Sequence, residues 1–157
     1  MNGLMLHGGA KPCTLDELRL TPTPEPTKTH TPIPHAEMVD TVCKFAKVEG
    51  LEILDMELGV QAGKDKDTGL VLQAARMFGL LTIGLPGGTQ GAPQLAEREY
   101  SVMLGLRNSH DKAFAWGLTL GSRVFVCDNL CFSGEITINK KHTGGIRTNA
   151  HASAGTA

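Results

Sequence analysis

Ionisable and amide side chains gather in the last third of the chain, between residues 107 and 143. They lie where apolar runs end, and chains often place binding or catalytic side chains at such turns. Their spacing matches no motif of catalysis or metal binding, so the sequence predicts no metal and no cofactor and assigns no catalytic residue. Twelve of them are candidate binding residues: Arg107, Asn108, His110, Asp111, Lys112, Arg123, Asp128, Asn129, Glu135, Lys140, Lys141 and His142.

Three kinds of chemistry are open to these residues. The basic ones could contact phosphates, which supply most of the affinity for nucleic acid. His110 beside Asp111 could form a base with its orienting carboxylate. Adjacent side chains of an extended chain point to opposite faces, however, and Asn-Ser-His-Asp also suits a turn. Asp111, Asp128 and Glu135 could converge on Mg²⁺ for phosphodiester chemistry.

The cysteines offer a weaker alternative. Cys127 ends an apolar, β-branched run and needs a partner histidine, His110 or His142, to become a nucleophile. A small apolar side chain at a strand end is the simpler interpretation. Cys131 follows four residues later, which is a loose spacing for zinc.

The elements that position these residues are mainly strands. The apolar period predicts one principal helix over 35–49, stopped by Gly50. Strands are expected over 51–58, 77–83, 99–107, 123–127 and 132–139, with helix or strand open for 70–75 and loops over 61–69 and 86–93. Strands joined by short turns after a single helix predict an α+β fold. We expect an antiparallel sheet of four to six strands with one principal helix packed on one face.

The N-terminal part has a different character. Thr14 and Glu17 have the spacing of a capping box for a short helical turn. Five prolines between positions 22 and 34 exclude a helix or a central strand, so an extended arm is predicted there. We therefore divide the chain into an N-terminal piece with a proline-rich arm (1–34), an α+β domain (35–143) and a disordered tail (144–157).

Composition bounds the function only loosely. The formal net charge is −1, so the chain lacks the overall basic surplus of a dedicated nucleic-acid binder. No apolar run reaches the roughly 18 residues that span a membrane. The first eleven residues lack the pattern of a secretory signal, so reduced thiols and a cytoplasmic location are expected.

Two blocks of the sequence resemble a known family. Residues 21–27 (TPTPEPT) and 32–35 (PIPH), together with 107–112 (RNSHDK), 123–130 (RVFVCDNL), 132–135 (FSGE) and 141–143 (KHT), are similar to the phage/plasmid-like proteins of domain-of-unknown-function family 932. The resemblance implies a bacterial, phage or plasmid setting and no established activity. The segment 61–75 is longer than the family leads one to expect, and relatives extend further beyond His142.

Three hypotheses for the function follow. The first is a non-enzymatic binding protein of a mobile element, acting on nucleic acid, single-stranded for instance, or on a nucleic-acid-processing complex. The second is a counter-defence protein that inhibits a host immune complex by binding it. The third is a metal-dependent hydrolase or nuclease that uses His110, Asp111, Asp128, Glu135 and His142. A sheet with an open edge can also pair with a second copy of the chain.

Overall fold

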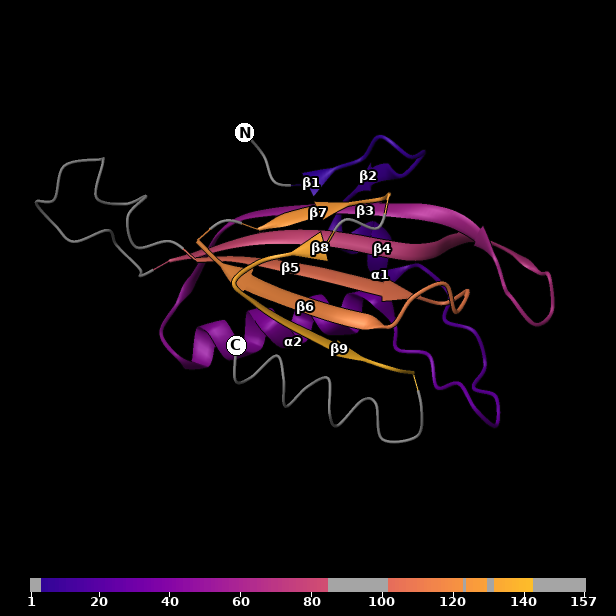
Figure 1. Ribbon diagram of the computed structural model, residues 1–157. Coiled ribbons are helices and arrows are strands. Elements are labelled where there is room, and N and C mark those ends of the chain that lie inside the picture. Colours follow the sequence, from indigo (N-terminus) through magenta and orange to yellow (C-terminus); the bar gives the residue numbers. More distant parts are fainter. Residues whose placement is uncertain (1–3, 85–101, 123, 130–131, 143–157) are drawn as a thin grey trace, which may run out of the picture.

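A six-stranded antiparallel sheet forms the centre of the molecule (Figure 1). The structure is a computed structural model, and it describes residues 4–84, 102–122, 124–129 and 132–142. In spatial order the strands are β2 (Lys11–Cys13), β3 (Glu52–Lys64), β4 (Val71–Gly84), β5 (Val102–Ser109), β6 (Trp116–Gly121) and β9 (Ile136–Lys140). The predicted α+β class and the sheet of up to six strands are confirmed.

A second, three-stranded sheet was not predicted. It contains β1 (Leu4–Met5), β7 (Phe125–Cys127) and β8 (Phe132–Ser133) in the order β1-β7-β8, and β1 runs parallel to β7. The N-terminal piece therefore takes part in both sheets, since β2 pairs with β3. The pairing of β1 with β7 joins segments that are about 120 residues apart, so no short window of the sequence could predict it.

The principal helix, α2 (His35–Val48), matches the predicted helix over 35–49. Its buried side chains include Met38, Val39 and Val42, which are spaced to form one apolar stripe. The helix ends at Glu49, and Gly50 follows with a φ of 72°, a left-handed conformation that glycine adopts without strain. The short helix α1 (Leu15–Arg19) begins at Thr14, and both hydrogen bonds of the predicted capping box are present.

The large sheet is covered on both faces, with α2 on one and the small sheet on the other (Figure 1). Alternate residues of β4 serve the two cores: Met77 and Leu81 pack on the helix side, and Phe78 and Leu80 pack against the small sheet. A strand buried on both faces has a continuous apolar sequence. Residues 70–75, which the sequence left open between helix and strand, belong to β4 from Val71 onward.

Two expectations about the loops and strands are wrong. The predicted loop over 61–69 is shorter, because β3 continues to Lys64 and pairs with the start of β4. The predicted strand over 132–139 is two strands in different sheets, β8 and β9, which separate at Gly134. A side chain at Gly134 would collide with Thr119 Oγ1, so glycine allows the chain to cross β6 closely.

The proline-rich arm (residues 21–34) contains neither helix nor strand, as predicted. It is docked on the domain, with Ile33 completely buried in the main core. The predicted loop over 86–93, the tail over 144–157 and Arg123 lie outside the described residues.

Candidate functional site

Two groups of side chains lie on opposite faces of the sheet near the end of β5. Leu104 and Leu106 pack on the helix side of the sheet, and strand alternation places Asn108 on the same side. Arg107 points to the other side, where it contacts Phe132 of the small sheet. We call the first group the histidine network (His30, His35, Asn108, His110 and His142) and the second the arginine site (Arg107, Phe114, Phe132 and Asn139).

Asn108 is the centre of the histidine network and is completely buried. Its amide nitrogen donates to the carbonyl oxygen of Ile33 at 2.7 Å and to Nδ1 of His35 at 3.0 Å. Its amide oxygen accepts a hydrogen bond from Nε2 of His142 at 2.7 Å. One amide thus joins the proline-rich arm, the start of α2 and the segment after β9.

The partners of the histidines fix their tautomers. Nε2 of His35 lies 2.7 Å from the carbonyl oxygen of Ala74, and Nε2 of His110 lies 2.8 Å from that of Ile33. Carbonyl oxygens only accept, so both rings carry their proton on Nε2, and Nδ1 of His35 accepts from Asn108. The two rings stack with centroids 3.8 Å apart and an angle of 9° between their planes.

Burial keeps this network uncharged. Desolvation holds the pKa of His35 well below its ordinary value and lowers the pKa of His110 and of His30. Desolvation, with a contribution from the neighbouring histidines, lowers the pKa of His142 to about 4. At neutral pH the network consists of neutral rings whose hydrogen bonds hold elements of the fold together.

The pair His110-Asp111 does not converge on one atom. Asp111 is completely buried on the opposite side of the chain, where its carboxylate accepts from Nε of Arg76 at 2.9 Å and from Oγ of Ser109 at 2.6 Å. Lys112 forms ion pairs with Asp65 at 3.2 Å and Asp67 at 2.7 Å. These contacts give both charged residues of the turn a structural role, the second alternative left open by the sequence.

The acidic candidates are also separated. Asp128 accepts hydrogen bonds from the backbone N–H groups of His7, Gly8 and Ala10, and so closes the turn between β1 and β2. Asn129 is exposed beside it. Glu135 accepts from the backbone and the hydroxyl of Ser122. Within the described part of the chain, no three His, Cys, Asp or Glu side chains are placed to hold a metal ion.

The arginine site has a different character. The guanidinium carbon of Arg107 lies 4.6 Å from the ring centre of Phe132 and 5.2 Å from that of Phe114. One terminal nitrogen donates to Oδ1 of Asn139 at 3.2 Å, while Nε is buried and has no hydrogen-bond partner in the described part of the chain. None of the described carboxylates forms an ion pair with Arg107. Burial lowers the pKa of Arg107.

A glycine makes room for this arrangement. A Cβ atom on Gly117 would lie 2.9 Å from Asn139 Oδ1 and from Phe132 Cε1, and 3.1 Å from Nε of Arg107. The aromatic, amide and guanidinium groups therefore pack directly on the backbone of β6. The sequence indicated Arg107 but not Phe114, Phe132 or Asn139; the alternation along β8 and β9 was the signal available, and the break between them obscured it.

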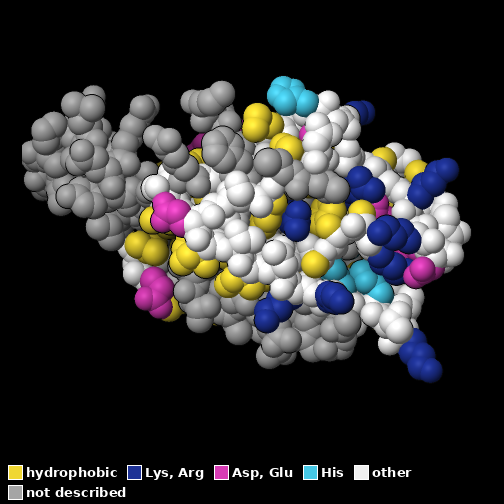
Figure 2. Space-filling model, in the orientation of Figure 1, with side chains coloured by type: hydrophobic (Ala, Val, Ile, Leu, Met, Phe, Trp, Pro, Cys, Tyr) yellow, Lys and Arg dark blue, Asp and Glu magenta, His cyan; other side chains and the backbone are white. Residues whose placement is uncertain are grey.

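Two further lysines lie at the end of the edge strand β9. Lys140 ends β9 and Lys141 follows it, and both are exposed. Figure 2 shows Lys and Arg side chains spread over this face of the molecule with hydrophobic side chains between them and fewer acidic ones. Basic groups interleaved with aromatic surface suit a flexible, negatively charged chain.

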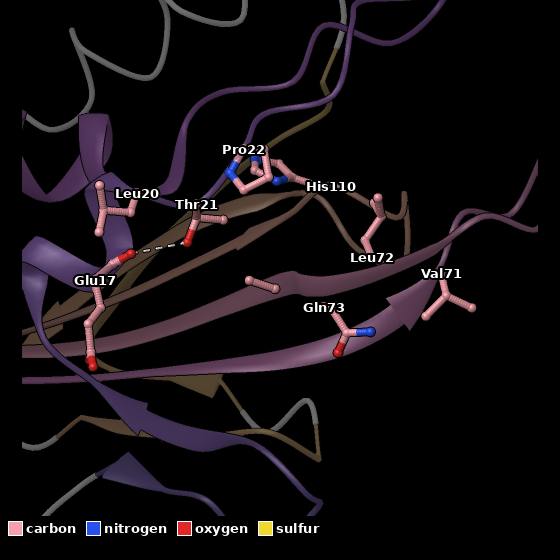
Figure 3. A pocket seen from close by; sticks show the side chains of 9 residues that line it. Glu17, Leu20, Thr21, Pro22, Val71, Leu72, Gln73 and His110 are labelled. Atoms are coloured by element: carbon pink, nitrogen blue, oxygen red, sulfur yellow. Dashed lines mark hydrogen bonds between the residues drawn. The ribbon is translucent and has the colours of Figure 1, made fainter.

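A groove of about 470 Å³ opens on the helix side, between the end of α1 and the start of β4 (Figure 3). Leu20, Thr21 and Pro22 form one side, and Val71, Leu72 and Gln73 form the other. His110 of the histidine network also lines it. The groove is mostly apolar, and the proline-rich arm supplies part of its wall.

Comparison of the chain with family models, with curated proteins and with solved structures gives no match. Among the described residues, no helix combines the length and the apolar character needed to cross a membrane. The geometry of the two sites is therefore the basis for any statement about function.

Proposed function

We propose that this protein binds single-stranded nucleic acid on the sheet face that carries the arginine site, without a catalytic step. The observation that carries the proposal is the guanidinium of Arg107, which lies near two phenylalanine rings and forms no ion pair with a described carboxylate. A role in a mobile element, which the resemblance of the sequence implies, belongs to the same proposal.

The chemistry of the arginine site suits a nucleic-acid strand. A guanidinium offers several N–H donors in a plane and pairs well with phosphate oxygens, and it also stacks on flat rings. Phe114 and Phe132 are partly exposed, so a base can approach the rings near Arg107. Stacking on aromatic side chains tolerates any base, which favours binding with little sequence preference.

The surrounding charge sets the expected strength of binding. Lys140 and Lys141 are exposed at the end of the edge strand β9, next to Asn139 of the arginine site. Alternation places Lys140 on the opposite face from Asn139, so it can reach a bound strand only around the sheet edge. Lys112 contributes little, because Asp65 and Asp67 neutralise it. With few phosphate contacts and a net charge of −1, the affinity should be modest and should fall steeply with salt.

Fluorescence anisotropy tests the proposal directly. A labelled single-stranded oligonucleotide and the matching duplex are titrated with the protein at about 50 and 200 mM salt, the range over which phosphate contacts weaken. We expect binding of the single strand at the lower salt and a loss of about tenfold in R107A, as removal of one strong interaction predicts. Arg19→Ala is the matched control, because Arg19 is an exposed arginine on α1, paired with Asp16 and Asp40.

Two outcomes of this titration would contradict the proposal. Absence of binding at the lower salt would reject the proposal. Equal losses of affinity in R107A and R19A would show that general charge, and not the arginine site, attracts the strand.

A further inference from the structure

The histidine network fastens the proline-rich arm to the rest of the domain, which is a role beyond the proposed binding function. Both Asn108 and His110 donate to the carbonyl oxygen of Ile33 in the arm. The backbone N–H of Thr31 donates to the carbonyl oxygen of His142 at 2.9 Å. The ring of His30 lies against that of His142, with centroids 5.1 Å apart. The polar attachment of residues 30–33 thus depends on neutral histidines and one asparagine.

Protonation of the network histidines would replace these hydrogen bonds by donor–donor and cation–cation repulsion. If His35 gained a proton on Nδ1, its new N–H would face the N–H of Asn108, two donors without an acceptor. If His35 and His110 were both charged, two cations would lie 3.8 Å apart in a buried site that screens charges poorly. His35 is also the first residue of α2, where the helix dipole disfavours positive charge.

The charged groups around the network do not relieve this conflict. Asp111 favours the charged form of His110, but Arg76 and Ser109 already occupy its carboxylate. Asp65 and Asp67 act on His30 together with Lys112, which they bind and which opposes them. On the helices, Glu37 lies in the first turn of α2 and Glu17 lines the groove beside His110.

We propose that the histidine network is a proton-operated latch: in mildly acidic solution it releases the proline-rich arm, while the six-stranded sheet stays folded. The main core of the sheet is built from apolar side chains such as Leu81, Leu106 and Trp116, and the arm contributes Ile33 to it. Release of the arm exposes Ile33 but leaves the other side chains of this core in place, and such a local opening needs less free energy than global unfolding. Release of Thr21 and Pro22 would also widen the groove in front of His110.

The pH range of release follows from the direction of the shifts. The histidines have a lowered pKa in the latched state and an ordinary pKa of about 6.5 when released. The released form therefore binds more protons below about pH 6.5. The latch is closed above that pH, weakens as the pH falls, and gains no further driving force from His142 below its latched pKa of about 4.

Hydrogen exchange measured by NMR between pH 7 and pH 4, corrected for the intrinsic rates, tests the latch. The amide of Thr31 reports the arm, because it donates to His142, and the amide of Leu81 in β4 reports the sheet. We expect the protection of Thr31 to fall at least tenfold between pH 6.5 and pH 4.5 while Leu81 remains protected. In H142Q, which keeps a donor toward Asn108 but cannot titrate, the loss of protection should shift to lower pH. His7→Gln removes an exposed histidine outside the network and should change nothing.

Two outcomes would overturn the proposal. Simultaneous loss of protection at Thr31 and Leu81 would show global unfolding without a latch. The same pH profile in wild type and H142Q would show that this histidine does not drive release. If H142Q does not fold, the ring signals of the wild-type histidines decide: network rings that titrate near pH 6.5 with the arm still protected would contradict the latch. Oligonucleotide binding at neutral pH does not enter these measurements.

Discussion

Arg107 and Asn108 are neighbours on one strand, yet they belong to opposite kinds of environment. Asn108 lies under α2, completely buried, and its amide nitrogen and oxygen have partners at 2.7 to 3.0 Å. Arg107 is half-buried on the other face, near two aromatic rings, and its Nε has no partner among the described residues. The same contrast separates the whole histidine network from the arginine site.

The difference shows how polar groups that resemble one another in sequence can be told apart in structure. A buried group whose donors and acceptors are matched within the protein stabilises the fold and offers little to a ligand. A partly exposed cation without a carboxylate partner has bonding capacity left for a ligand. Of the two regions, the arginine site is therefore the better candidate for binding, and the histidine network the better candidate for stability.

The largest effect should come from breaking the centre of the network. Asn108→Leu leaves Nδ1 of His35 and Nε2 of His142 without a partner, while Ile33 keeps its hydrogen bond from His110. Two unpaired buried groups of this kind together cost roughly 3 kcal/mol. Urea unfolding at neutral pH measures the decrease in stability. Asn139→Leu on the arginine side is the matched control and should cost well under half as much. Similar decreases in the two variants would remove the contrast between the faces.

A second test concerns protons. The pKa of His142 is about 4 in the folded protein, so its titration should remove roughly 3 kcal/mol of stability as the pH falls from about 6.5 to about 4. The sign follows because the unfolded chain binds the proton more tightly. The free energy of unfolding, measured against pH, should decline less in H142Q. A parallel decline in both proteins would indicate that other groups carry the pH dependence.

The arginine site should respond in the opposite way, with binding affected more than stability. Arg107→Ala should weaken oligonucleotide affinity by about tenfold, or roughly 1.4 kcal/mol. Arg107→Lys keeps the charge but loses the flat guanidinium near the two rings, so it should recover only part of the affinity. Full recovery in R107K would show that charge alone matters, and the aromatic rings would then lose their proposed role.

The smallest effect should appear at the edge of the sheet. Replacing Lys140 and Lys141 by alanine removes two exposed charges. The slope of log affinity against log salt should decrease by about 0.7 for each phosphate of a single strand that the protein no longer neutralises. Anisotropy titrations at several salt concentrations give this slope. An unchanged slope would place these lysines outside the binding surface and would confine the site to Arg107 and its neighbours.

The sequence predicted the elements around the two sites but not the contrast between the sites, since it grouped Arg107, Asn108, His110 and His142 as binding candidates of one kind. Period and capping signals predicted α2 and the capping box at Thr14 because such signals are local. Alternation in β5 correctly implied that His110 and Asp111 would diverge. The convergence of His30, His35 and His142 on Asn108 depends on contacts between distant segments, as does the placement of Phe132 over Arg107. Contacts between residues so far apart in sequence cannot be predicted from the spacing of residues in a motif.

The three-stranded sheet limits when the chain can fold during its synthesis. The carboxylate of Asp128 holds the N–H groups around Gly8, 120 positions earlier, and the parallel pairing of β1 with β7 lies beside it. On the ribosome, β1 must therefore remain without its partner until β7 has emerged. Exposed strand edges in such an interval invite misassociation, so we expect soluble yield to depend on the rate of translation more than on the stability of the finished fold.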